Sequence, residues 1–391
     1  MAAGWLRTLA KLTAVVAVVY AGIVAAVMLS PAFQAVFVYL HVLRIPFPTH
    51  YTAPHLHGLH GARPVTITTQ DGLTLGAWHI LPAGPLTLHA EMAMVRGEAQ
   101  DEVFDRLLQT SQAKIIIYFH GNAGTRGVGH RVDFYRTVTS HLGAHVLTFD
   151  YRGFGESEGT PTEDGLNLDA FAAYEWVLSR IGEENSGRVL IWGHSLGSGV
   201  SSRFISELCL QHAKEEQRIK QHLVQAMPET SDALSHILPL PSALILDAPF
   251  STLRDGALHH PAGTLFQIIP KLDWLLDRFL AHNFPSVERI KTIDIPILIV
   301  HGRQDKRLPI ELGEQLYNSA IDARTERARL GQRFHTVPVT ANGFRTKVRE
   351  THGVRFVELP DGDHNTIWMQ PGILSSVQQF VQDFAGNVHR S

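Results

Sequence analysis

The 391-residue sequence has one cysteine, Cys209, and no Asn-x-Ser/Thr sequence. An intramolecular disulfide is therefore excluded, and no N-glycosylation acceptor argues for lumenal exposure. Neither absence locates the protein, because proteins that are stable without disulfides occur in oxidising and reducing compartments alike.

The sequence also lacks an excess of positive charge. Its 34 Lys and Arg residues face 37 Asp and Glu residues, giving a formal net charge of −3. Such a chain has no broad basic surface, so we expect no nucleic-acid partner. His55, His57 and His60 lie close together, but no Cys or acidic residue completes a ligand set, so we expect no metal site.

Charged residues are missing from residues 12–43, and the first part of this stretch is almost wholly apolar. It is long enough to span a bilayer and longer than the apolar core of a cleaved signal peptide. We therefore predict a transmembrane anchor at residues 12–30. Arg7 and Lys11 precede it, which favours cytoplasmic residues 1–11 and a lumenal or extracellular location for the rest of the chain.

Residues 31–64 follow as a membrane-proximal linker that is rich in Pro and His. Phe33, Phe37 and Tyr39 are the aromatic residues of its first part. Two interpretations remain open, because these side chains suit either the membrane interface or the end of a kinked span.

Residues 65–391 alternate between apolar runs and longer amphipathic runs, as strands and helices do. The predicted strands are 64–69, 74–79, 114–119, 145–149, 188–192, 243–246, 297–300 and 354–359. The predicted helices are 130–141, 163–181, 197–213, 309–320 and 372–384. Ile- and Val-rich strands separated by helices indicate an α/β fold with a mostly parallel sheet covered on both faces.

Four segments interrupt this alternation and are predicted as insertions: 86–113, 214–240, 255–290 and 321–350. The third is rich in Leu, Ile, Phe and Trp, which suits a helical lid, although apolar stripes more often pack on a core. Within the fourth, residues 323–350 carry seven Lys and Arg residues against Glu326 and Glu350. They form either a solvated face or a contact with anionic lipid head groups.

The motif Gly193-His194-Ser195-Leu196-Gly197 lies where a predicted strand passes into a predicted helix. This is the arrangement of a nucleophile elbow, in which a sharp turn exposes a serine hydroxyl above the sheet. Glycines are needed on either side because the turn leaves no room for side chains. We predict that Ser195 is a nucleophile rather than a simple helix cap.

A serine nucleophile needs a base, and the base needs an orienting carboxylate. His364 follows the last predicted strand, the position expected for the base in this chain order. Asp305 follows the strand before it and is the preferred acid, with Asp247 at the end of an earlier strand as the alternative. We predict that Ser195, His364 and Asp305 form a catalytic triad that needs no metal or organic cofactor.

Donors for the developing oxyanion are expected from the loop after strand 114–119, which reads His-Gly-Asn-Ala-Gly. The backbone amides of Asn122 and Leu196 are the predicted pair, because such a hole combines this loop with the residue after the nucleophile.

These motifs resemble the α/β-hydrolase superfamily. The segments HGNAGTRG, TFDYRGFGES, IWGHSLGSGV and LILDAPFSTLR are similar to the integral-membrane lysophosphatidylserine and monoacylglycerol lipases called α/β-hydrolase domain-containing protein twelve. The resemblance implies an N-terminal anchor, a lumenal catalytic domain in the endoplasmic reticulum or another endomembrane, and a triad at Ser195, Asp305 and His364. It implies hydrolysis of lysophospholipid or monoacylglycerol through an acyl-enzyme. A protein S-acyl-thioesterase, a general carboxylesterase and an inactive membrane scaffold remain alternatives, and the sequence does not decide the oligomeric state.

Overall fold

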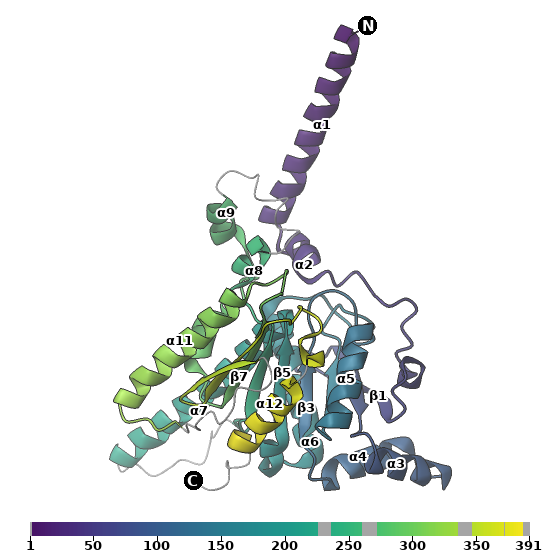
Figure 1. The fold of residues 1–391 in the computed structure, drawn as a ribbon, viewed down its shortest axis with the longest axis vertical. Helices are drawn as coiled ribbons and strands as arrows, with labels where there is room; N and C mark the ends of the chain where they lie inside the picture. The colour runs from purple at the N-terminus through teal and green to yellow at the C-terminus, as the bar shows by residue number, and fades with distance from the viewer. Residues whose placement is uncertain (1, 226–235, 260–271, 335–345, 371, 386–391) are drawn as a thin grey trace.

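The computed structural model describes residues 2–225, 236–259, 272–334, 346–370 and 372–385. Helix α1 (Ala2–Leu29) projects from the rest of the chain (Figure 1). Its stretch Gly4–Ala26 has a mean hydropathy of 2.1 and none of it is buried. Among the described residues, α1 is the one helix long and apolar enough to cross a membrane. It begins ten residues before the expected anchor start at residue 12, because Arg7 and Lys11 are good helix formers with long side chains that can reach water.

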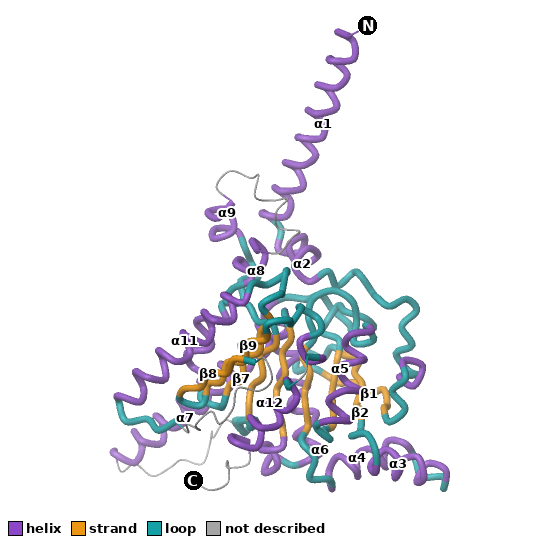
Figure 2. The backbone as a smooth tube through the Cα atoms, viewed as in Figure 1, coloured by secondary structure: helices purple, strands orange, loops and turns teal. Residues whose placement is uncertain are grey.

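A nine-stranded sheet, counted among the described residues, forms the centre of the molecule (Figure 2). The strands are β1 (Ala62–Thr68), β2 (Thr74–Ile80), β3 (Ile115–Phe119), β4 (His145–Phe149), β5 (Val189–His194), β6 (Ala243–Asp247), β7 (Ile297–Gly302), β8 (Lys347–Thr351) and β9 (Val354–Leu359). Their order is β1-β2-β4-β3-β5-β6-β7-β9-β8, with parallel pairing from β4 to β9 and antiparallel pairing at both edges. The order reverses around β3, so a crevice is expected at the carboxyl ends of β3 and β5.

Helices cover both faces of the sheet because alternate residues of each strand point to opposite sides. In β3, Ile117 packs in one hydrophobic cluster with the helices of one face, whereas Ile116 packs in a second cluster with those of the other. The first face carries α6 (Glu163–Ile181), α7 (Leu196–Gln225) and α11 (Ile310–Arg329). The second carries α5 (Gly129–His141) and α12 (Ile373–Phe380). The predicted mostly parallel sheet with two covered faces is confirmed.

The insertion expected at 86–113 is a pair of helices, α3 (Pro85–Val95) and α4 (Gln100–Thr110), with a small core of its own around Phe104. The structure of segment 214–240 differs in part from the expected insertion. Helix α7 continues to Gln225 and so takes in nearly half of that segment. Residues 226–235 lie outside the described residues.

The structure differs from the expectation at both ends of segment 321–350. Helix α11 continues to Arg329, and β8 (Lys347–Thr351) pairs with β9 as the last strand of the sheet. Charged residues made β8 look like an exposed loop, but an edge strand needs them because they discourage pairing with another chain.

Arg324, one of the arginines considered for lipid contact, is buried instead. Its guanidinium donates to the backbone carbonyls of His352, Ile293 and Ile295, and only 1% of the residue is exposed. Several others form ion pairs within the protein, such as Arg349 with Glu314. Because its guanidinium is bound to these buried carbonyls, Arg324 cannot contact a lipid head group.

Replacing Arg324 with methionine is expected to lower the free energy of unfolding by roughly 3 kcal/mol, because three buried carbonyls lose their donor. Chemical denaturation measures this change. Arg329→Met is the matched control on the same helix, since its side chain is mostly exposed and, among the described residues, forms an ion pair with Glu326 alone. Equal destabilisation by the two substitutions would contradict a structural role for Arg324.

The membrane-proximal linker is more ordered than expected. Helix α2 (Pro31–Tyr39) packs on the body through Ala35 and Tyr39, while Phe33 and Phe37 remain exposed. The Tyr39 hydroxyl hydrogen-bonds His282 at 3.2 Å. Tyr39 is therefore a core residue rather than a membrane-interface residue. A 3-10 turn (Pro54–His57) then leads to β1.

The apolar segment 255–290 contains the helices α8 (Leu253–His259), α9 (Leu272–Phe279) and α10 (Ser286–Arg289). Residues 260–271, which hold Leu265, Phe266, Ile268 and Ile269, lie outside the described residues. Helix α9 contacts α1, as Figure 1 shows at the base of the projecting helix. Helix α9 of this segment therefore lies beside the candidate anchor.

Candidate active site

Ser195 sits on the turn between β5 and α7. Its φ of 51° lies in the left-handed region, which costs free energy for a residue with a side chain. A Cβ on Gly193 would lie 2.3 Å from the Ser201 Oγ, and one on Gly197 would lie 1.9 Å from the Phe119 carbonyl oxygen. Both positions therefore require glycine. The turn has the tight geometry that the sequence predicted.

His364 and Asp305 reach Ser195 from loops that follow β9 and β7. The His364 Nε2 lies 3.0 Å from the Ser195 Oγ, and its Nδ1 lies 2.7 Å from the Asp305 Oδ2. A carboxylate only accepts, so Nδ1 carries the proton and Nε2 is free to accept from the serine hydroxyl. The structure brings together all three side chains that the sequence singled out.

The Asp305 carboxylate is fixed by its backbone surroundings. Its Oδ1 accepts from the amides of Arg307 at 2.8 Å and Leu308 at 2.9 Å, which leaves Oδ2 for His364. Burial acts to raise the pKa of Asp305, but the neighbouring His301 ring and the hydrogen bond from His364 hold it well below its ordinary value. Asp305 is therefore ionised and able to stabilise a charged imidazole.

Asp247, the alternative acid, has a different environment. Its backbone carbonyl accepts from the Ser195 amide at 3.0 Å, so it supports the turn through the main chain. Its side chain is buried, and among the described residues its Oδ1 has no hydrogen-bond partner. Burial raises the pKa of Asp247 to about 8, and the charge of Asp305 acts in the same direction. A carboxyl that is neutral near pH 7 cannot orient an imidazolium.

Because the pKa of Asp247 is higher in the folded protein than its ordinary value of 3.8, the folded state retains a proton that the unfolded state loses. Its contribution to the free energy of unfolding is expected to decrease as the pH rises from about 4 to about 8. Asp247→Asn removes this dependence. Thermal unfolding should then show the melting temperature of the variant rising relative to wild type from about pH 5 to about pH 8. A difference in melting temperature between the variant and wild type that stays constant over this pH range would contradict the raised pKa of Asp247.

The predicted oxyanion donors lie on two sides of Ser195. The Leu196 amide opens α7 and has no preceding helical turn to supply an acceptor. The Asn122 amide donates to no acceptor among the described residues. A Cβ on Gly121 would lie 3.3 Å from the Ser195 Cβ, so the loop after β3 runs directly beside the nucleophile.

The sequence did not predict the role of Arg131 in this loop. Its buried guanidinium donates to the carbonyls of Gly121, Asn122, Ala123 and Thr125. Because Arg131 binds the carbonyl oxygens of the loop, the backbone amides of the loop can point away from Arg131. An arginine two residues into a helix gives no local signal of such contacts.

His194 was also missed as a supporting residue. A carbonyl oxygen only accepts, so the His194 Nε2 donates to the His364 backbone oxygen, at 2.9 Å. Burial holds the pKa of His194 well below its ordinary value, so the ring is neutral. This bond ties the residue before the nucleophile to the loop that carries His364.

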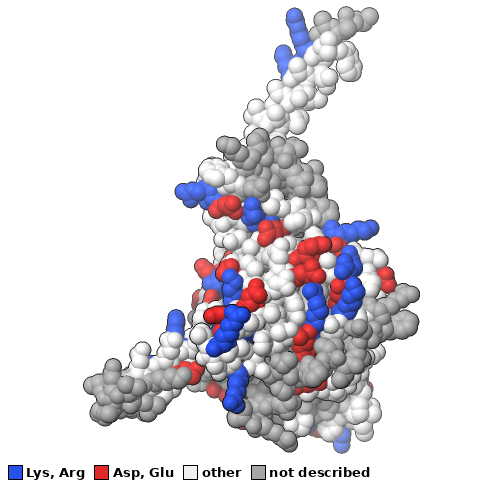
Figure 3. Space-filling view, turned by 60° about the vertical axis from the view of Figure 1, so that its left-hand side comes forward, with Lys and Arg blue, Asp and Glu red and all other residues white. Residues whose placement is uncertain are grey.

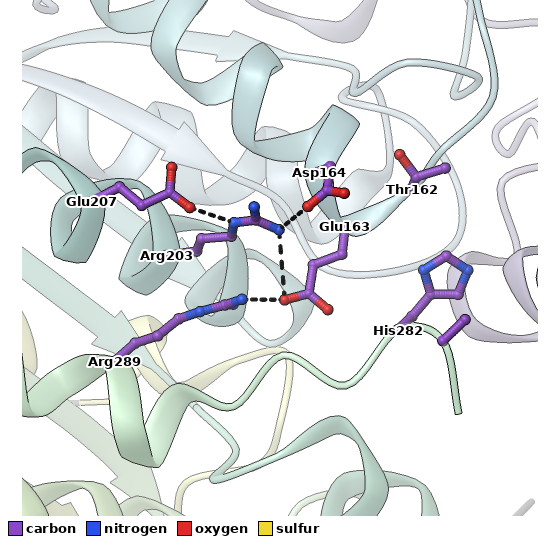
Figure 4. Close-up of a pocket in the computed structure, with 8 residues that line it drawn as sticks. Thr162, Glu163, Asp164, Arg203, Glu207, His282 and Arg289 are labelled. Atoms are coloured by element: carbon purple, nitrogen blue, oxygen red, sulfur yellow. Dashed lines mark hydrogen bonds and ion pairs between the residues drawn. The ribbon is translucent and has the colours of Figure 1, made fainter. Parts of the chain in front are cut away.

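A polar pocket of about 390 Å³ lies away from these three side chains, none of which lines it. Figure 4 shows Glu163 between Arg203 and Arg289, with Asp164 and Glu207 also paired to Arg203. The charges are satisfied within the protein. This network joins the start of α6 to α7 and to Arg289 at the end of α10, and it therefore fixes the C-terminal end of the apolar segment 255–290.

The sequence profile of the Alpha/beta hydrolase family matches residues 116–375. Lysophosphatidylserine lipase ABHD12 from Danio rerio is 33% identical over 334 residues, which cover 84% of this chain and 76% of the relative. Lysophosphatidylserine lipase ABHD12 from Macaca fascicularis is 34% identical over 326 residues, covering 83% and 72%. This chain belongs to the alpha/beta hydrolase family. The predicted fold class and the predicted enzyme class, a serine hydrolase that cleaves esters, are confirmed.

Among solved structures, an alpha-beta hydrolase from Vibrio vulnificus matches this hydrolase with a TM-score of 0.54 and 15% identity. The match covers 90% of this chain and 94% of the Vibrio chain. At such low identity the match supports the fold alone.

Proposed function

We propose that this hydrolase cleaves the acyl esters of single-chain lipids by two-step acyl transfer on Ser195. The observation that carries the proposal is the hydrogen-bonded series from Asp305 through His364 to the Ser195 hydroxyl, with distances of 2.7 and 3.0 Å. In this arrangement His364 takes the serine proton while the oxygen attacks the ester carbonyl. Asp305 holds the imidazole in the required tautomer and stabilises its positive charge.

The tetrahedral intermediate places a negative charge on the former carbonyl oxygen. The amides of Asn122 and Leu196 are proposed to donate to it. His364 then protonates the leaving alcohol, and the acyl group stays on Ser195. A water molecule, deprotonated by His364, attacks this acyl-enzyme and releases the fatty acid. No step requires a metal or an organic cofactor.

The substrate class is inferred from the relatives and from the N-terminal helix. The relatives named above are lysophosphatidylserine lipases, and this chain spans about three quarters of their length. Helix α1 would hold the site beside a bilayer, where lysophospholipid or monoacylglycerol could enter beneath the apolar segment 255–290 as a lid. We further propose a cytoplasmic N-terminus and a lumenal catalytic domain in the endoplasmic reticulum or another endomembrane, since Arg7 and Lys11 precede the apolar stretch.

A panel of substrates tests this proposal. The purified full chain should hydrolyse lysophosphatidylserine, other lysophospholipids or monoacylglycerol faster than diacylated phospholipids and faster than S-acylated peptides. The same panel with Ser195→Ala separates this activity from a contaminant. Preferential cleavage of the S-acylated peptide would replace the lipase proposal with a thioesterase, and a wild type inert to every ester would overturn it.

A further inference from the structure

A short strap, defined as residues 40–47, connects α2 to the rest of the linker and exposes several apolar side chains. They are Val42, Leu43, Ile45 and Phe47, and 94% of Phe47 is exposed. Such a cluster of apolar side chains in water is unfavourable, and it normally marks a surface that another apolar phase covers. The cluster is therefore expected to have a partner.

The backbone of this part of the linker pairs with the loop that carries the proposed oxyanion donor. The Ala123 amide donates to the Tyr39 carbonyl at 2.9 Å, and the Gly124 amide donates to the Leu43 carbonyl at 3.1 Å. The Thr125 amide donates to the Ile45 carbonyl at 2.9 Å, and its hydroxyl donates to the same oxygen. Most of these acceptors lie on the strap, so a shift of the strap would move the loop.

The loop needs these partners because its conformation is strained. Ala123 has a φ of 56°, which costs free energy for a residue with a side chain, and Gly124 follows it with a φ of 65°, which glycine adopts readily. Arg131 holds the carbonyls of this loop and the linker holds its amides. The Asn122 amide lies between these two sets of bonds, and both sets therefore help to fix its orientation.

The strap also lies at the membrane end of the molecule. Helix α2 joins it to α1 and is fixed to the body, since the Gln34 side chain bonds the Phe279 carbonyl at 2.6 Å and the Ala281 amide at 2.8 Å. The first acidic residue of the chain is Asp71, so nothing near the strap in sequence would repel lipid phosphates. On the face drawn in Figure 3, the projecting helix shows few charged side chains and the acidic side chains lie on the rest of the molecule.

We propose that the strap docks on the bilayer that holds α1, and that this contact fixes the oxyanion loop in its catalytic conformation. The occupant is a lipid surface, because the exposed side chains are apolar and continuous in the chain with the candidate span. The coupling to activity rests on the proposed reaction at Ser195. The hydrolase is then most active when it is seated on lipid, whatever ester it cleaves.

The lipid contact is tested by site-specific labelling of the full chain in phosphatidylcholine vesicles. Cys209 is the single native cysteine and is buried, and burial raises the pKa of its thiol to about 11, so it labels poorly. Phe47→Cys carries an environment-sensitive fluorophore at the strap. Val95→Cys is the matched control, because Val95 is 88% exposed at the end of α3, far from α1 in Figure 1.

Nitroxide-labelled lipids should quench the fluorophore at residue 47 several-fold more than the one at residue 95. Equal quenching at the two positions would overturn the lipid contact. This measurement does not depend on catalysis, so it remains decisive even if the proposed reaction is wrong.

The coupling is tested with the triple variant Leu43→Ser, Ile45→Ser, Phe47→Ser and with Val95→Ser as control. In vesicles, kcat for water-soluble p-nitrophenyl butyrate should fall about tenfold in the triple variant, because a small displacement of an oxyanion donor weakens transition-state binding. The affinity for a boronic acid, which mimics the oxyanion, should fall in parallel, while KM and the melting temperature change little. Wild-type kcat and boronic acid affinity in the triple variant would overturn the coupling. A wild type that cleaves no ester would instead refute the proposed function.

Discussion

Replacing Ser195 with alanine is expected to lower kcat for acyl esters by about 10⁶-fold, because the substitution removes the nucleophile and leaves only the oxyanion donors and substrate binding. The folded state should persist. Among the described residues, the Ser195 hydroxyl has one hydrogen-bond partner, His364, and alanine keeps the glycines and the strand-to-helix turn in place. Hydrolysis of p-nitrophenyl butyrate gives the loss of activity, and the melting temperature should stay within about 2 °C of wild type.

Ser206→Ala is the matched control for this experiment. Ser206 lies on α7, the helix that follows Ser195, and is buried, but its hydroxyl contacts Thr292 rather than the site. Its kcat should equal that of wild type. More than about 1% residual activity in Ser195→Ala would show that another group carries the reaction.

Asp305→Asn is expected to lower kcat by about 10⁴-fold. An asparagine keeps an oxygen for the amides of Arg307 and Leu308, so the loop should fold. Its amino group then faces the His364 Nδ1 and favours the tautomer with the proton on Nε2. That tautomer cannot accept from Ser195, and the negative charge that stabilises the imidazolium is lost. Steady-state kinetics with a short-chain ester measures the effect.

The comparison with Asp247→Asn decides between the two candidate acids. Asp247 holds the site through its backbone carbonyl, which the substitution leaves intact, so kcat should change less than tenfold. Similar losses in the two variants would contradict the assignment of Asp305. A larger loss in Asp247→Asn would exchange the roles of the two residues.

The sequence located the serine turn because its requirements are local. An apolar strand, two glycines and a helix follow one another within one short stretch, and the structure places Ser195 there at positive φ. His364 and Asp305 could be chosen because they follow successive parallel strands, whose carboxyl ends meet at one edge of the sheet. Their catalytic roles remain proposals until the variants above are measured.

Other features could not be predicted because they depend on tertiary contacts. Strand β8 was missed because its charges are typical of a loop until a neighbouring strand is known. Arg131 binds carbonyls whose direction is set by two left-handed residues. The strap and the oxyanion loop are 80 residues apart in the sequence at the hydrogen bond from Thr125 to Ile45. The pattern of apolar and polar residues does not predict such a contact.

The most direct test of the account is to find the residue that a fluorophosphonate modifies. The wild-type chain is treated in vesicles, digested and mapped by mass spectrometry. We expect one adduct, on Ser195, and none in Ser195→Ala, because His364 activates that hydroxyl alone. An adduct at wild-type rate on Ser195→Ala, or a wild type that stays unmodified, would contradict the claim that this hydrolase works through an acyl-enzyme on Ser195.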